Sequence, residues 1–98
     1  MAGLLFKVIA VFISHCIVGF LFYRGRVVQK LPIFDSDLIV FAAPSLAAFF
    51  AYFWILFRSS YFPKQMWPRI GAIALICLLV TFLSHWASMI LAFNTYGT

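Results

Sequence analysis

The chain has 98 residues, of which 66% are hydrophobic and only 9% are charged. Soluble domains are about half apolar and about one quarter charged, and a domain this small leaves much of its surface exposed. Lipid must therefore cover the apolar side chains, which excludes an ordinary soluble fold. The net charge of +5 comes from cations that flank apolar segments and form no basic domain, so we expect no nucleic-acid binding.

The first apolar segment covers about residues 4–23, which matches the roughly 20 residues that cross the hydrocarbon core. Lys7 lies near one end, and Arg24 and Arg26 follow the other, where long cationic side chains reach the lipid headgroups. The segment is longer than the core of a signal peptide, and no small-residue cleavage site follows it. We therefore expect a retained membrane helix.

A connection over residues 24–37 leads to the second apolar segment. Pro32 is expected to stop any continuation of the first helix, because the residue before a proline avoids the helical conformation. Asp35, Ser36 and Asp37 are expected to cap the next helix. Their side-chain oxygens can accept hydrogen bonds from its free amides, and the negative charge suits the positive end of the helix dipole.

The second apolar segment covers residues 38–57 and contains no charged residue. Pro44 lies in its second turn. A proline there removes a backbone donor and crowds the preceding turn, so we expect it to kink the helix or to open its first turns.

Three alanines recur at every fourth residue of this segment, at Ala43, Ala47 and Ala51, and therefore share one face. Small residues at this spacing allow membrane helices to approach closely, so we expect the face to pack against the other helices. A bulky replacement such as Ala47→Leu should then disturb assembly more than a change at Phe50.

The second connection, residues 58–69, is basic and aromatic, which is typical of the headgroup layer. Pro63 and Pro68 should keep it from forming a long helix. The third apolar segment covers about residues 70–93, and a short polar tail follows it. The expected fold is an all-α integral membrane protein, a single membrane domain over residues 1–98 with three transmembrane helices and short connections.

Cations are found on both sides of the membrane in such a three-span topology. The side of the N-terminus carries Lys7, Arg58, Lys64 and Arg69, and the opposite side carries Arg24, Arg26 and Lys30. The excess of positive charge favours an N-terminus in the cytoplasm. In size and span count the chain resembles phage holins, bacteriocin immunity proteins and accessory subunits of respiratory or transport complexes. We therefore expect the bacterial cytoplasmic membrane, that is, the inner membrane.

The first and third segments share a short motif. Residues 11–15 read Val-Phe-Ile-Ser-His, and residues 81–85 read Thr-Phe-Leu-Ser-His. Both segments cross the membrane in the same direction, and each histidine lies eight residues before the expected end of its segment. We therefore predict that His15 and His85 lie at one depth.

Other small and polar residues share a helix face with these histidines, and ionisable groups inside a membrane usually face the protein interior. The candidate intramembrane site consists of Ser14, His15, Thr81, Ser84, His85 and Ser88, and the expected helix-packing positions are Gly19, Ala43, Ala47 and Ala51. We expect the small faces of all three helices to meet in the middle of the bundle.

Three functions fit this site. The first is packing, because neutral histidine and serine join membrane helices at roughly 0.6–2 kcal/mol per hydrogen bond. The second is a small pore, holin-like or transport protein lined by the face of His15 and His85. The third is a haem b-carrying membrane subunit in which both histidines ligate the haem iron between the helices, as in membrane b-type cytochromes.

We favour the first function, a non-enzymatic membrane protein that acts through helix association. It would be an accessory subunit of a membrane complex or a homo-oligomer, and its partners would be the lipid bilayer and other membrane proteins or copies of itself. No catalytic residue, metal site or cofactor is expected, because no carboxylate lies inside a span and no catalytic or phosphate-binding motif is present.

Overall fold

The computed structural model describes residues 2–59, 61, 62 and 64–96, apart from the side chains of residues 34 and 35. Its elements in chain order are α1 (Ala2–Val27), η1 (Pro32–Asp35), η2 (Leu38–Ala42), α2 (Ala43–Phe57) and α3 (Met66–Tyr96). The described residues contain no strand. Three helical segments are long and apolar enough to cross a membrane, which confirms the predicted all-α, three-span membrane protein.

The bounds of the three spans agree with the sequence to different degrees. The second span covers Leu38–Phe57, as predicted, whereas α1 and α3 continue beyond the apolar segments at both ends. The described residues of the second connection form no long helix, as expected, although α3 begins within it, at Met66 and so before Pro68. Pro68 lies in the first turn of α3, where a missing amide costs nothing because the first four amides have no partner within the helix.

The second span begins with a widened helical turn. Residues Leu38–Ala42 form a π-helix, and the amide of Ala43 donates to the carbonyl of Leu38, five residues earlier. Pro44 follows immediately, in the first turn of α2. The prediction that Pro44 opens the start of this helix is confirmed, since the wider turn accommodates a residue that cannot donate to the fourth carbonyl before it.

The expected cap of this helix is not formed by Asp37, whose side chain makes no capping hydrogen bond. Asp37 already has helical backbone angles, and its carboxylate pairs with the guanidinium of Arg26 at 2.7 Å. Its charge therefore ties the end of α1 to the start of the second span. The carbonyl of Ser36 accepts from the amides of Ile39 and Val40, and the side chain of Asp35 lies outside the described residues.

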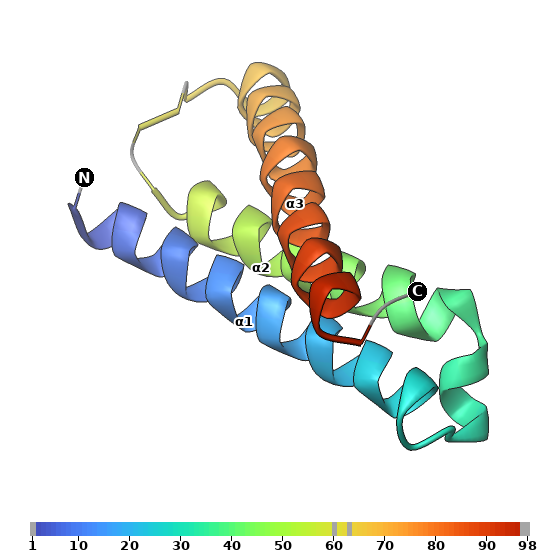
Figure 1. Ribbon diagram of the computed structural model, residues 1–98. Coiled ribbons are helices and arrows are strands. Elements are labelled where there is room, and N and C mark those ends of the chain that lie inside the picture. Colours follow the sequence, from blue (N-terminus) through green and yellow to red (C-terminus); the bar gives the residue numbers. More distant parts are fainter. Residues whose placement is uncertain (1, 60, 63, 97–98) are drawn as a thin grey trace.

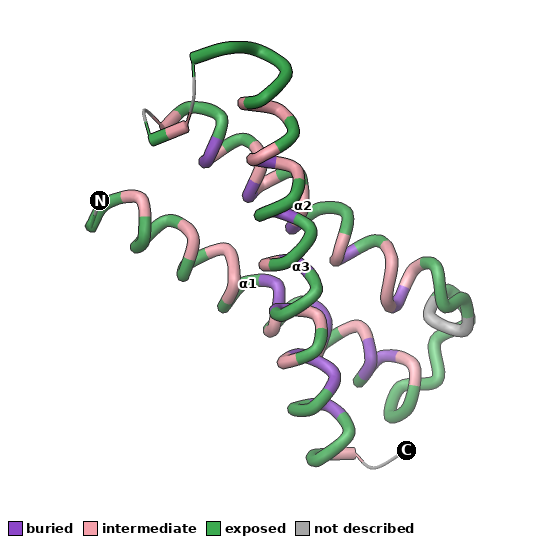
Figure 2. Tube along the Cα trace, turned by 90° about the horizontal axis from the view of Figure 1, so that it is seen from above, coloured by how far each residue is buried: buried purple, intermediate pink, exposed green. Residues whose placement is uncertain are grey.

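Helices α1 and α2 run in opposite directions, and α3 lies across both (Figure 1). Figure 2 shows that the buried residues gather where the three helices meet, while the outward surfaces are exposed. Those surfaces carry large apolar side chains such as Phe6, Trp54 and Leu79, as expected of a surface that faces lipid. The polar side chains of the candidate site lie inside this meeting region.

Two apolar clusters lie on either side of the candidate site along α3. One contains Ile73 and Cys77 with Ala48, Tyr52 and Leu56 of α2, and Leu4, Val8 and Val11 of α1 pack against it. The other contains Ala92 with Tyr23 and Val40. Since Ser84 and Ser88 lie between these clusters on α3, the molecule has a polar layer between two apolar ones.

Helix α2 is rotated relative to the orientation expected from its alanines. Its buried residues are Pro44, Ala48, Tyr52 and Leu56. Ala43 and Ala47 are exposed, and Ala51 is half-buried. The alanine face therefore lies beside the buried row, at the edge of the helix, and does not meet the small faces of α1 and α3 in the middle.

Candidate functional site

The centre of the polar layer is a hydrogen bond between α1 and α3. His15 Nδ1 lies 2.6 Å from Ser84 Oγ. Both side chains are buried, with 4% of His15 and none of Ser84 exposed. The Ser84 hydroxyl also lies 3.1 Å from the carbonyl of Thr81, to which it can donate.

The single hydroxyl proton of Ser84 cannot be donated to both His15 Nδ1 and the Thr81 carbonyl. The tautomer of His15 therefore depends on which of the two atoms accepts that proton. When Ser84 donates to the Thr81 carbonyl, His15 Nδ1 carries the ring proton and donates to Ser84 Oγ. Nε2 is then a bare acceptor. When Ser84 donates to Nδ1, Nε2 carries the proton and is a donor.

His85 lies beside His15, in agreement with the depth expected from the repeated motif. The ring centroids are 6.2 Å apart, with the planes at 28°. His85 is half-buried and faces α2, where the Ser45 hydroxyl lies 3.4 Å from its Nδ1. Ser45 Oγ also lies 2.7 Å from the carbonyl of Phe41, whose ring meets the His85 ring edge-on. The two histidines thus link all three helices.

The approach of α1 to α3 is closest at Gly19. A methyl group at this position would overlap Ser88 Oγ and lie 3.2 Å from Ser88 Cβ. Ser88 Oγ donates to the carbonyl of Cys16 at 3.1 Å, and Cys16 Sγ lies 3.6 Å from the carbonyl of Ser84. Side chains of α3 therefore contact the α1 backbone directly, which requires glycine on α1 and serine on α3.

The predicted site residues do not all lie together. Ser14 is exposed and its hydroxyl donates at 2.8 Å to the carbonyl of Ala10 in its own helix. Thr81 is buried, and its hydroxyl has no hydrogen-bond partner among the described atoms. Among the predicted site residues, His15, Ser84, His85 and Ser88 therefore make the polar contacts between helices.

Sequence reasoning missed three residues of this layer. Ser45 joins His85, Cys16 contacts the Ser84 carbonyl, and Tyr52 is completely buried with its hydroxyl close to Ser84. Ser45 had a detectable signal, because it is the only hydroxyl-bearing Ser or Thr between residues 38 and 57. Tyr52 had none, since tyrosine is also common at the membrane surface.

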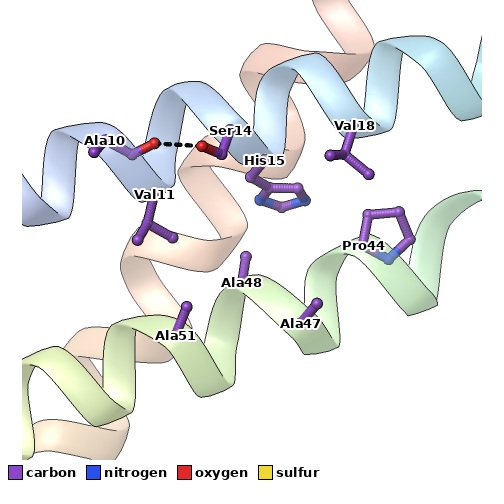
Figure 3. Close-up of a pocket in the computed structure, with 9 residues that line it drawn as sticks. All are labelled: Ala10, Val11, Ser14, His15, Val18, Pro44, Ala47, Ala48 and Ala51. Carbon is purple, nitrogen blue, oxygen red and sulfur yellow. Dashed lines mark hydrogen bonds between the residues drawn. The ribbon is translucent and has the colours of Figure 1, made fainter.

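A groove of about 280 Å³ opens between α1 and α2, and the His15 side chain points into it (Figure 3). Its walls are otherwise small or apolar: Ala10, Val11, Ser14 and Val18 from α1, and Pro44, Ala47, Ala48 and Ala51 from α2. The second ring nitrogen of His15, Nε2, is buried and has no hydrogen-bond partner among the described atoms.

The arrangement does not fit a haem held by His15 and His85. Ser88 donates to the carbonyl of Cys16, the residue next to His15, and Ser84 bonds His15 Nδ1, so the packed helices leave no slot for a porphyrin between the rings. Within the described residues, no three His, Cys, Asp or Glu side chains are grouped so that they could hold a metal ion. Comparisons with protein-family models, with curated proteins and with solved structures find no match for this chain.

Proposed function

We propose that this membrane protein acts through association with another transmembrane helix, as an accessory subunit of a membrane complex or as a homo-oligomer, without catalysis. The observation that carries this proposal is the α1–α2 groove, which is lined by alanines and contains a histidine with one unpartnered nitrogen. The partner helix would lie along this groove.

The shape of the groove supports a helix as its occupant. On the α2 side of the groove, Ala47, Ala48 and Ala51 cover the backbone with little more than methyl groups. The α1 side has Ala10 and Ser14 beside larger residues. Small residues allow a third backbone to come close, and van der Waals contact is a main source of helix association in lipid. Exposed Ala43 extends the small surface by one turn.

The chemistry of His15 supports the same occupant. An unpaired polar group costs about 1–3 kcal/mol when it is buried, and the hydrocarbon core has no water to relieve it. A polar side chain on an entering helix, after a small shift of the imidazole, would pair with Nε2 in either tautomer if it carried both a donor and an acceptor. The hydroxyl of serine or threonine has both.

A pore lined by His15 and His85 has less support. Ser84, Ser88 and His15 are buried within a single copy and are hydrogen-bonded between its own helices. A pore lined by these groups would require α1 to separate from α3, which would break those contacts.

Site-specific photo-crosslinking in cell membranes tests the proposal. A photoreactive amino acid replaces Ala47 in the groove wall or, as a matched control, Leu83 on the lipid-facing side of α3. We expect a discrete protein adduct from position 47, at twice the mass of the chain for a homo-oligomer or at another single mass for an accessory subunit.

The control position should give lipid adducts only. The proposal fails if positions 47 and 83 give the same pattern, because the groove would then be one more surface that faces lipid. It also fails if neither position gives a protein adduct at native expression levels.

A further inference from the structure

The start of α1 and the end of α2 lie at the same end of the molecule (Figure 1). A second cavity, of about 340 Å³, lies between these two helix ends, where we expect the lipid headgroups. It is lined by Gly3, Leu4 and Lys7 of α1 and by Ile55, Arg58, Ser59 and Tyr61 at the end of α2 and the following connection.

The charge of this cavity is not balanced by the chain. The only acidic residues are Asp35 and Asp37, and both belong to the connection at the opposite end of the molecule. Asp37 pairs there with Arg26. Lys7 and Arg58 therefore bring two positive charges into one cavity that is lined by no carboxylate of the described residues.

The end of α2 is held in place by a third cation, Arg69 of α3. Its guanidinium donates to the carbonyls of Phe57 and Ser59 and lies over the Phe57 ring. The Ser59 hydroxyl donates to the carbonyl of Leu56 at 2.8 Å. These contacts occupy Arg69 and the Ser59 proton, so they fix the wall of the cavity and leave ligand binding to Lys7, Arg58 and Tyr61.

We propose that this cavity binds the phosphate group of an anionic phospholipid. The guanidinium of Arg58 can donate two parallel hydrogen bonds to phosphate oxygens, Lys7 adds a second charge, and the Tyr61 hydroxyl adds a donor. Arg58 is already oriented, because its guanidinium lies 5.3 Å from the centre of the Trp54 ring. The proposal is independent of helix association, since none of these residues lines the α1–α2 groove.

The apolar residues of the cavity point to a lipid as the source of the phosphate. Leu4 and Ile55 line it together with the cations, so a bound molecule needs a charged part and an apolar part. A phospholipid has both, and in the headgroup layer its phosphate is held at the level of the snorkelling cations. The cavity therefore combines two cations with apolar side chains, as a phospholipid requires.

Tryptophan quenching by brominated lipids tests the proposal, with Trp54 as the reporter beside Arg58. The background variant carries Trp67→Phe and Trp86→Phe and is reconstituted in nanodiscs of phosphatidylcholine with brominated phosphatidylglycerol or, for comparison, brominated phosphatidylcholine. We expect brominated phosphatidylglycerol to be preferred near Trp54 by about fivefold, the order expected for a cation at the lipid surface. Lys7→Gln should lower this preference clearly and leave the share that Arg58 contributes.

Two matched pairs of variants distinguish lipid binding in the cavity from a general attraction of the lipid to surface charge. Lys64→Gln removes an equal charge, from the connection that follows α2, without touching the cavity, and should keep most of the preference. Gly3→Leu should fill the cavity and abolish the preference at unchanged charge, while Gly71→Leu should not. Nothing lies within 4 Å of a Cβ at either glycine, so both leucines fit the fold.

Three outcomes would overturn the proposal. Equal losses for Lys7→Gln and Lys64→Gln would mean that the preference reflects overall charge. An unchanged preference in Gly3→Leu would place the lipid outside the cavity. Competition by inorganic phosphate, beyond that of sodium chloride at equal ionic strength, would mean that the site takes free phosphate and does not require a lipid.

Discussion

The two sides of α1 differ in how they meet their neighbours. Toward α3 the contact is close and polar, with Gly19 against Ser88 and His15 hydrogen-bonded to Ser84. Toward α2 the contact is looser, and a groove of about 280 Å³ remains between alanine side chains. The same helix therefore completes one interface within the chain and leaves the other open.

His15 belongs to both sides, since its Nδ1 is bonded toward α3 while its ring lines the groove toward α2. In a medium without water, a buried polar group is stable only where the protein itself supplies a partner. The α3 side meets that requirement and the groove side does not, because Nε2 has no partner among the described atoms. A single copy of this chain is therefore stabilised by the contacts of α1 with α3 and has an unfilled site between α1 and α2.

The largest effect is expected on the free energy of unfolding, in the variant Gly19→Leu at the close contact of α1 with α3. The new side chain overlaps Ser88 and breaks its hydrogen bond to the Cys16 carbonyl, so we expect a loss of about 3 kcal/mol in the free energy of unfolding. Denaturant titration in mixed micelles, followed by near-UV circular dichroism, measures it. Gly71→Leu is the control, since its position is open, and an equal loss in both variants would refute the close contact.

The next largest effect is expected on association, in the variant Ala47→Leu in the α1–α2 groove. Because Ala47 is exposed in the groove wall, we expect the free energy of unfolding to change by less than about 0.5 kcal/mol. Association should instead weaken about tenfold, which corresponds to ~1.4 kcal/mol, because leucine fills the groove. The yield of protein adduct from a photoreactive residue at Ala43 measures association.

Phe50→Ala is the comparison for this experiment, since Phe50 is exposed on the same helix and does not line the groove. We expect it to leave the adduct yield within about twofold of the parent protein. If Ala47→Leu and Phe50→Ala changed the adduct yield equally, the groove would not be the interface.

The smallest effect is expected at the far end of the α1–α2 contact, in Asp37→Asn. The variant removes the ion pair with Arg26, but 74% of the Asp37 side chain is exposed, so solvent screens the pair. We expect a loss of about 0.5 kcal/mol or less in the free energy of unfolding, reduced further in high salt. A loss above about 2 kcal/mol would show that this ion pair contributes more than the polar layer to holding the helices together.

The sequence indicated the polar layer more fully than the packing of α2. The helical spacing of Thr81, Ser84 and Ser88, and the repeated Ser-His motif, were sufficient to predict a common face and depth. The rotation of α2 could not be predicted from Ala43 and Ala47. Lipid and neighbouring helices are equally apolar, so hydrophobic periodicity does not distinguish the two sides of a membrane helix.

The local details of the site were also beyond sequence reasoning. Neighbouring Ser14 and His15 point in different directions, and only the packed structure shows that His15 meets α3 while Ser14 bonds within its own helix. The capping expected of Asp37 failed for a similar reason, since Arg26 is distant in sequence and close in space.

The most direct test of this account is a double-mutant cycle on His15 and Ser84. His15→Leu, Ser84→Ala and the double variant are compared by their free energies of unfolding in bicelles, with a second cycle of His15→Leu and Ser14→Ala as the control. A hydrogen bond that joins α1 to α3 predicts a coupling energy of about 1 kcal/mol for His15 with Ser84, and near zero for His15 with Ser14. A coupling energy near zero in the first cycle would contradict the polar layer as the feature that holds the bundle together.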